Sequence, residues 1–130
     1  MLGLDTSILV DLDKGKRETI EKIKTIATMH KSQGCISFIS YLEFYHGILD
    51  RNVRNFEKAY LYLNMYPVLQ STKKTAEICA QFRKKYDKKG VSLSLSDILI
   101  AAQIFEHNLV LVTKDKDFEK IEEIRKIILT

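Results

Sequence analysis

Acidic residues stand at four places where an apolar, strand-like run of the sequence gives way to a turn or to the start of a helix. These residues are Asp5, Glu43, Asp97 and Asp115. Asp5, for example, directly follows the short apolar run 1–4, and Asp115 comes soon after the run 109–113. In a parallel α/β sheet the carboxyl ends of the strands share one edge, where ligands bind. We therefore expect these four carboxylates to meet there.

Carboxylates that are packed together repel one another, and a hard divalent cation is the usual remedy. Mg²⁺ and Mn²⁺ prefer oxygen ligands, and such a cation lowers the pKa of a bound water, orients it toward phosphorus and offsets charge on the leaving oxygen. The three histidines are scattered at His30, His46 and His107, so the sequence has no spaced Cys/His set for zinc. The pattern favours a metal-dependent phosphodiesterase.

Each acid also has an ordinary structural explanation. Ser40 with Glu43, and Ser94 with Asp97, have the spacing of a capping box, and Asp115 or Asp117 could cap the last helix. Asp5 is harder to explain in this way, because it directly follows the first strand. The convergence of four acids on one edge of the expected sheet favours the shared site.

Hydroxyl groups stand beside these acids. Ser7 and Thr113 could orient the carboxylates or the waters on a metal, although both residue types are also common in turns and caps. Asp117, two residues after Asp115, is a second candidate for the last acid of the group.

Strands and helices alternate along the chain. The expected strands cover residues 2–4, 35–39, 68–70, 109–113 and 126–129. The expected helices cover 8–10, 18–31, 41–50, 56–65, 75–89, 98–107 and 118–122. This alternation predicts a three-layer α/β/α sandwich with a central parallel sheet of about five strands.

The composition is that of an ordinary globular chain, with 45% hydrophobic and 29% charged residues. We expect one domain over residues 1–130. The first apolar run is too short for a signal peptide or a membrane span. Cys35 and Cys79 lie in apolar settings and are expected to be free thiols in the reducing cytoplasm. The net charge of +4 alone does not decide whether the chain binds nucleic acid.

Four segments, in order along the chain, resemble the successive motifs of PIN-domain ribonucleases. They are Leu4–Leu9, Glu43–Gly47, Asp97–Ala102 and Leu111–Phe118. Within that family they are most similar to the VapC-type toxins of type II toxin–antitoxin pairs. The resemblance implies an endoribonuclease that uses Mg²⁺ or Mn²⁺, with Asp5, Glu43, Asp97 and Asp115 as its acidic quartet. Ser7 stands where many members have asparagine, and Thr113 matches a threonine of the family.

The resemblance also implies partners: an RNA substrate, a cognate antitoxin that occupies the cleft, and a second copy of the chain in a homodimer. Two other function classes stay open. The chain could be a non-catalytic RNA-binding or assembly module of the same fold, or a phosphoaspartyl phosphatase or receiver-like domain. Against the latter, Ser7 stands where a phosphatase of that type has a second aspartate.

Overall fold

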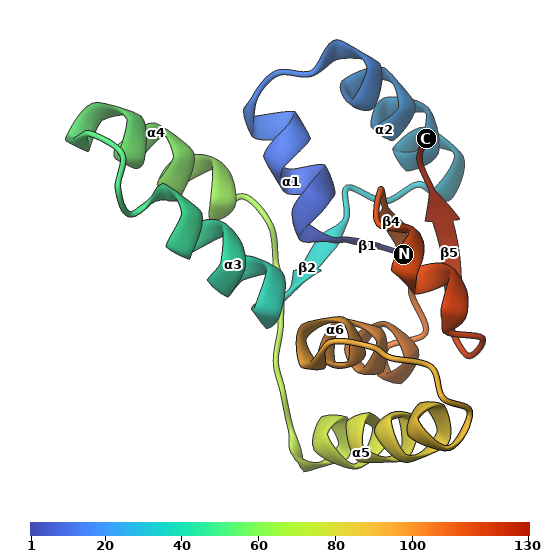
Figure 1. Ribbon diagram of the computed structural model, residues 1–130. Helices are drawn as coiled ribbons and strands as arrows, with labels where there is room; N and C mark the ends of the chain where they lie inside the picture. Colours follow the sequence, from blue (N-terminus) through green and yellow to red (C-terminus); the bar gives the residue numbers. More distant parts are fainter.

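Five short parallel strands form the centre of the computed structural model, which describes residues 1–130 (Figure 1). The strands are β1 (Leu2–Leu4), β2 (Cys35–Ser37), β3 (Val68–Leu69), β4 (Val110–Thr113) and β5 (Arg125–Ile128). The helices are α1 (Thr6–Asp13), α2 (Arg17–His30), α3 (Phe38–Ile48), α4 (Val53–Leu63), α5 (Lys73–Lys88), α6 (Leu95–Glu106) and the short 3₁₀ helix η1 (Lys116–Lys120). The expected α/β/α sandwich is confirmed.

The order of the strands across the sheet is β3-β2-β1-β4-β5. The chain builds outward from β1 through β2 to β3, and then returns to the other side of β1 to add β4 and β5. Leu4 pairs with Ile36 on one side and with Val112 on the other. The direction of winding thus reverses between β1 and β4, which is the position where open α/β sheets bind ligands.

Side chains on the two faces of the sheet belong to two separate hydrophobic cores. Leu2 and Leu4 of β1 pack with α1, α3 and α4, whereas Leu111 of β4 packs with α5 and α6 on the opposite face. Figure 1 shows the two groups of helices on either side of the sheet. Helices cover both faces, and the inner strands β2, β1 and β4 are buried along their whole length, as expected for a parallel sheet.

Gly3, in the middle of β1, lets α6 lie close against the sheet. A Cβ atom at this position would collide with the side chain of Ile104. The absence of a side chain therefore allows the last turn of α6, which carries Ile104, to approach β1.

The ends of the elements differ in places from the sequence-based expectation. The second strand ends at Ser37 rather than at residue 39, because the Ser37 hydroxyl accepts the amide N–H of Ile39 and starts α3 there. The last helix is a 3₁₀ turn that begins at Lys116, earlier than expected. Gly90 and Asn108 adopt positive φ angles of 71° and 53° at helix ends, as predicted.

The two cysteines, Cys35 and Cys79, are buried and unpaired, as expected. None of the helices combines the length and the apolar character that crossing a membrane requires.

Candidate active site at the carboxyl edge of the sheet

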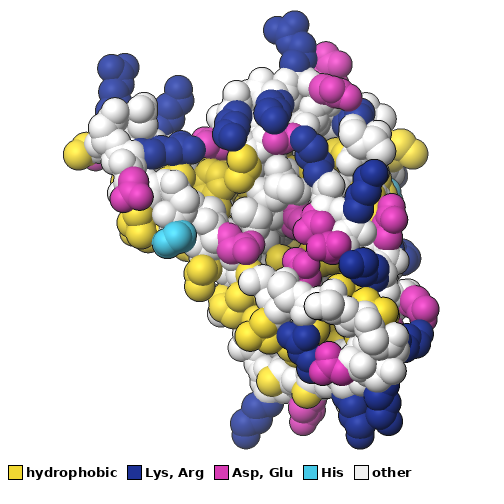
Figure 2. All heavy atoms as spheres, in the orientation of Figure 1, with side chains coloured by type: hydrophobic (Ala, Val, Ile, Leu, Met, Phe, Trp, Pro, Cys, Tyr) yellow, Lys and Arg dark blue, Asp and Glu magenta, His cyan; other side chains and the backbone are white.

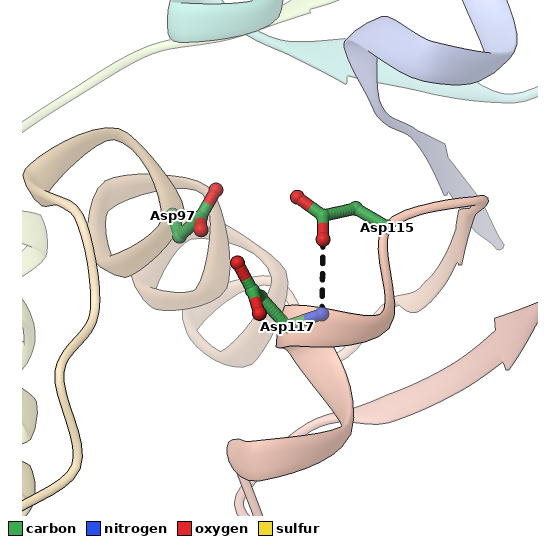
Figure 3. A group of neighbouring side chains, drawn as sticks. All are labelled: Asp97, Asp115 and Asp117. Carbon is green, nitrogen blue, oxygen red and sulfur yellow. Dashed lines mark hydrogen bonds between the residues drawn. The ribbon is translucent and has the colours of Figure 1, made fainter.

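Three aspartates face one another where α6 begins and β4 ends. Asp97, Asp115 and Asp117 each offer a carboxylate oxygen, and these oxygens lie within 4.8 Å of one another. Figure 3 shows Asp97 on α6 pointing toward Asp115, which follows β4, and toward Asp117 on η1. The Asp115 carboxylate also accepts the amide N–H of Asp117 at 2.9 Å, so it caps η1 while it faces Asp97. Both candidates for the last acid therefore lie in this group.

Asp5 lies beside this trio and is held by an ordered set of donors. Its Oδ1 accepts the Ser7 hydroxyl at 2.5 Å and the amide N–H groups of Ser7 and Ile8, which makes Asp5 the N-cap of α1. Its Oδ2 accepts only the Thr113 hydroxyl, at 2.6 Å, so a second lone pair on this oxygen is available to another ligand. The carboxylate of Asp5 is thus both buried and fixed in direction.

The hydroxyl of Thr113 connects two of the acids across the gap between β1 and β4. It donates to Asp5 and accepts the amide N–H of Asp115 at 2.9 Å. Ser7 makes a similar link, since its hydroxyl donates to Asp5 and accepts the amide N–H of Lys114. Both residues therefore contact Asp5 through hydrogen bonds and are not members of the trio.

Glu43 stands at the margin of the site, on the second turn of α3. Its carboxylate accepts the Thr6 hydroxyl at 2.5 Å, next to Asp5 in the sequence. The capping-box explanation for Glu43 is wrong, because α3 starts one residue after Ser37 and Ser40 is buried inside the helix. The hydrogen bond from Thr6 instead directs the Glu43 carboxylate toward the end of β1.

Asp97 sits at the third position of α6, where the Ser94 hydroxyl accepts its amide N–H at 3.1 Å. Ser94, not Ser96, is the cap. Burial raises the pKa of Asp97 above its ordinary value, and the negative charges of Asp115, Asp117 and Asp5 raise it further. Burial likewise raises the pKa of Asp5, against the opposing hydrogen bonds from Ser7 and Thr113. The site is therefore electrostatically unfavourable for its own ionised acids.

Almost no positive side chain compensates these acids. Asp117 forms an ion pair with Lys120 at 3.3 Å. The acids without any lysine or arginine within ion-pair distance are Asp5, Glu43, Asp97 and Asp115. Close carboxylate oxygens, raised pKa values and missing counter-charges fit a hard divalent cation, because oxygen donors of this kind are the ligands that Mg²⁺ and Mn²⁺ prefer.

The acids lie on an open face of the molecule. Figure 2 shows acidic side chains gathered near the centre of this face, above the two lower helices, with basic side chains around them. The largest cavity, of about 790 Å³, is at the opposite edge of the sheet, next to Met1, Gly34 and Pro67. A site that is open rather than enclosed can accept a segment of a long polymer.

Asp11 is a supporting residue that the acidic pattern in the sequence did not reveal. It is only 5% exposed, and it accepts the Thr19 hydroxyl and the Lys114 ammonium, both at 2.7 Å. The hydrogen bond from Lys114 holds the pKa of Asp11 below its usual range. Because Lys114 directly precedes Asp115, this pair of an exposed lysine with a buried aspartate anchors the turn that carries two of the acids. The sequence did contain one indication of this role, because Asp11 is the single charged residue within the otherwise apolar run 8–12.

Comparison with known proteins agrees with this geometry. The sequence profile of the PIN domain family matches residues 3–124, which is nearly the whole chain. A search of curated proteins found no match.

Several solved structures with the same fold are toxin–antitoxin complexes. One is VapBC2 from Rickettsia felis bound to a promoter DNA fragment, with a TM-score of 0.86, 22% identity, and coverage of 99% of this chain and 98% of that one. DNA-bound VapBC from Salmonella typhimurium gives a TM-score of 0.81 and 27% identity, covering 98% and 96%. A toxin–antitoxin complex from Klebsiella pneumoniae gives a TM-score of 0.74 and 27% identity, covering 95% of each chain.

Proposed function

The chain belongs to the PIN domain family, and we propose that it is an endoribonuclease that depends on Mg²⁺ or Mn²⁺ and serves as the VapC-type toxin of a toxin–antitoxin pair. The observation that carries the proposal is the group of three aspartates whose carboxylate oxygens lie within 4.8 Å of one another, and of which only Asp117 is paired with a lysine. RNA as the substrate rests on the resemblance of the four acidic motifs to those of PIN-domain ribonucleases.

The residues that would hold the cation are Asp97, Asp115 and Asp117, with Asp5 beside them. When bound, the cation supplies an activated water and offsets negative charge on the leaving oxygen. Thr113 and Ser7 keep the Asp5 carboxylate in one orientation, and Thr6 does the same for Glu43. Glu43, on α3, is the fifth acid of the proposed catalytic set.

A cleavage assay tests this proposal. The purified protein is incubated with labelled single-stranded RNA and with DNA of the same sequence, in Mn²⁺, in Mg²⁺ and in EDTA. We expect cleavage of RNA with either metal and none in EDTA. Metal-independent cleavage, or equal cleavage by a folded Asp5→Asn variant, would contradict it. A phosphoaspartyl enzyme would instead be labelled by acetyl phosphate.

The non-catalytic module is disfavoured, because all of the expected acids are present in the sequence and the carboxylates of Asp97 and Asp115 lie close together. It would be supported if Mn²⁺ failed to bind the apo protein at millimolar concentration.

A protein partner is part of the proposal. The structural relatives are toxin–antitoxin complexes, and the helical hairpin α3–α4 exposes large apolar side chains that a partner could cover. These side chains are Leu42, Leu49, Val53 and Leu61. Co-expression with the product of the adjacent gene should give a stable complex that no longer cleaves RNA.

A homodimer is a further proposal and rests on the resemblance alone. Light scattering on the purified chain should then give about twice the 15.1 kDa mass of one copy. We also propose a cytoplasmic location, which the two free cysteines support.

A further inference from the structure

A basic pocket lies between the end of α1 and the side of α4, away from the acids. It has a volume of about 560 Å³, within the range of ligand pockets. Its floor includes Ala59 and Tyr62 of α4, and its rim carries the cations Lys14, Arg51 and Lys58. We call this hollow the α1–α4 pocket. Figure 2 shows basic side chains on both sides of a hollow on the face that carries the central acidic group.

The charge of the α1–α4 pocket is only partly compensated. Asp13 is its one acidic lining residue, and it is already bound to Arg51 at 2.8 Å. That pair also ties the start of the α4 segment to the end of α1. Lys14 and Lys58 take part in no ion pair. Two free ammonium groups therefore face one opening, which suits an anion with several negative charges.

Helix α1 connects this pocket to the acids. It begins directly after Asp5 and ends at Asp13, so its eight residues span about 12 Å at about 1.5 Å per residue. A stacked nucleic-acid strand advances about 3.4 Å per nucleotide. A strand that lies along α1, with one phosphate at the acids, would therefore place phosphates at the pocket roughly three to four nucleotides away.

We propose that the α1–α4 pocket binds backbone phosphates of the single-stranded RNA substrate, three to four nucleotides from the phosphate that is cleaved. This inference rests on the proposed ribonuclease function and adds a second contact to it. The acidic centre repels a polyanion, and a cationic site at this distance supplies attraction without placing a positive charge among the metal ligands. Contacts of this kind position the strand and do not read its sequence.

Salt-dependent binding tests the pocket. The protein carries Asp97→Asn to prevent cleavage, and fluorescence anisotropy in EDTA follows a labelled RNA of about ten nucleotides. The test variant is Lys14→Gln/Lys58→Gln. The matched control is Lys84→Gln/Lys88→Gln on α5, which removes the same charge from an exposed helix with no ion pair at either lysine.

Loss of two phosphate contacts should make the negative slope of log K against log salt shallower by about 1.4. It should also weaken binding roughly 25-fold at about 0.1 M salt. The control pair should change neither. In the cleaving protein with Mn²⁺, an RNA of about three nucleotides should show no difference between Lys14→Gln/Lys58→Gln and its parent, because a strand seated at the acids is then too short to reach the pocket. In the cleaving protein, the same pair should raise KM for the long RNA and leave kcat unchanged.

Equal slopes and affinities for the two double variants would overturn the pocket assignment. The assignment is also overturned if Lys14→Gln/Lys58→Gln binds RNA normally but loses an acidic protein partner, because the pocket would then belong to that partner. The ribonuclease proposal is judged separately, by cleavage of RNA in Mn²⁺. Cleavage with an unchanged salt slope rejects the pocket alone, whereas absence of cleavage rejects the function.

Discussion

Two groups of acidic side chains in this molecule have opposite environments. Glu122 and Glu123, between η1 and β5, accept hydrogen bonds from Lys85, Lys89 and the Tyr86 hydroxyl. These contacts fasten the end of the chain to α5. The trio of Asp97, Asp115 and Asp117 has a single ion pair, between Asp117 and Lys120 on the surface.

The pKa values follow the same division. Partial burial raises the pKa of Glu123, but the hydrogen bonds from Lys85 and Tyr86 outweigh it and leave the pKa below its ordinary value. Burial and neighbouring carboxylates raise the pKa of Asp97 instead. The glutamate group is complete within the protein and stabilises the fold. The aspartate group has no such set of donors, and clustered acids with raised pKa values are typical of a candidate functional site.

The largest expected difference between the two groups is in catalysis. Asp97→Asn should lower RNA cleavage by more than about 100-fold, because even outer-sphere residues of metal sites cost 10–100-fold. Glu123→Gln should leave the cleavage rate unchanged. Initial rates in Mn²⁺, with circular dichroism to show that both variants are folded, make the comparison. Equal loss in both variants would mean that the aspartates act only through the fold.

Metal-dependent stability should separate the groups next. Mn²⁺ at about 100 times its Kd should stabilise the wild-type protein by about 2.7 kcal/mol, and Glu123→Gln by the same amount. Asp97→Asn should gain much less, because the close set of carboxylates is broken. Urea unfolding with and without Mn²⁺ measures the effect. An unchanged gain in Asp97→Asn would place the cation elsewhere.

Without metal, the substitution in the glutamate group should be the more destabilising of the two. Glu123→Ala should cost about 1–3 kcal/mol, because the Tyr86 side chain is only 2% exposed and its hydroxyl loses its acceptor. Asp97→Asn should leave the apo protein as stable as wild type or more stable, since it removes repulsion. Urea unfolding in EDTA gives both values. A marked destabilisation by Asp97→Asn would show that the aspartates hold the fold.

The smallest effect concerns pH. The pKa of Asp97 is raised in the folded state from 3.8, so the stability linked to its proton is present at low pH and lost as pH rises through the folded pKa. The pKa of Glu123 is lowered from 4.5, so its stabilisation is present above 4.5 and lost as pH falls through the folded pKa. The gain from Asp97→Asn and the cost of Glu123→Gln should therefore both be largest near neutral pH and shrink in acid. Thermal unfolding in EDTA across this range checks both trends.

The sequence contained most of the fold, because apolar runs and helix periods are local signals. Strand β1 and the positive-φ ends at Gly90 and Asn108 could be placed from neighbouring residues alone. The end of β2 could not, because Ser37 and Ser40 compete as caps and only packing decides between them.

Less of the site than of the fold could be predicted from the sequence. The acids at strand ends were visible because a parallel sheet brings those ends together. The inclusion of Asp117 depends on a 3₁₀ turn whose type has no sequence signature, and the pair of Asp11 with Lys114 joins residues 103 positions apart. The α1–α4 pocket likewise combines cations from separate segments, whereas the densest basic run in the sequence, 83–89, lies on α5.

The location of Mn²⁺ in crystals soaked with that ion tests the proposed metal site most directly. We expect an anomalous peak among the carboxylates of Asp97, Asp115 and Asp117, next to Asp5, and no peak at that place in crystals of the Asp97→Asn variant. No peak among the aspartates at millimolar Mn²⁺, or a peak only at Glu122 and Glu123, would contradict the proposed site.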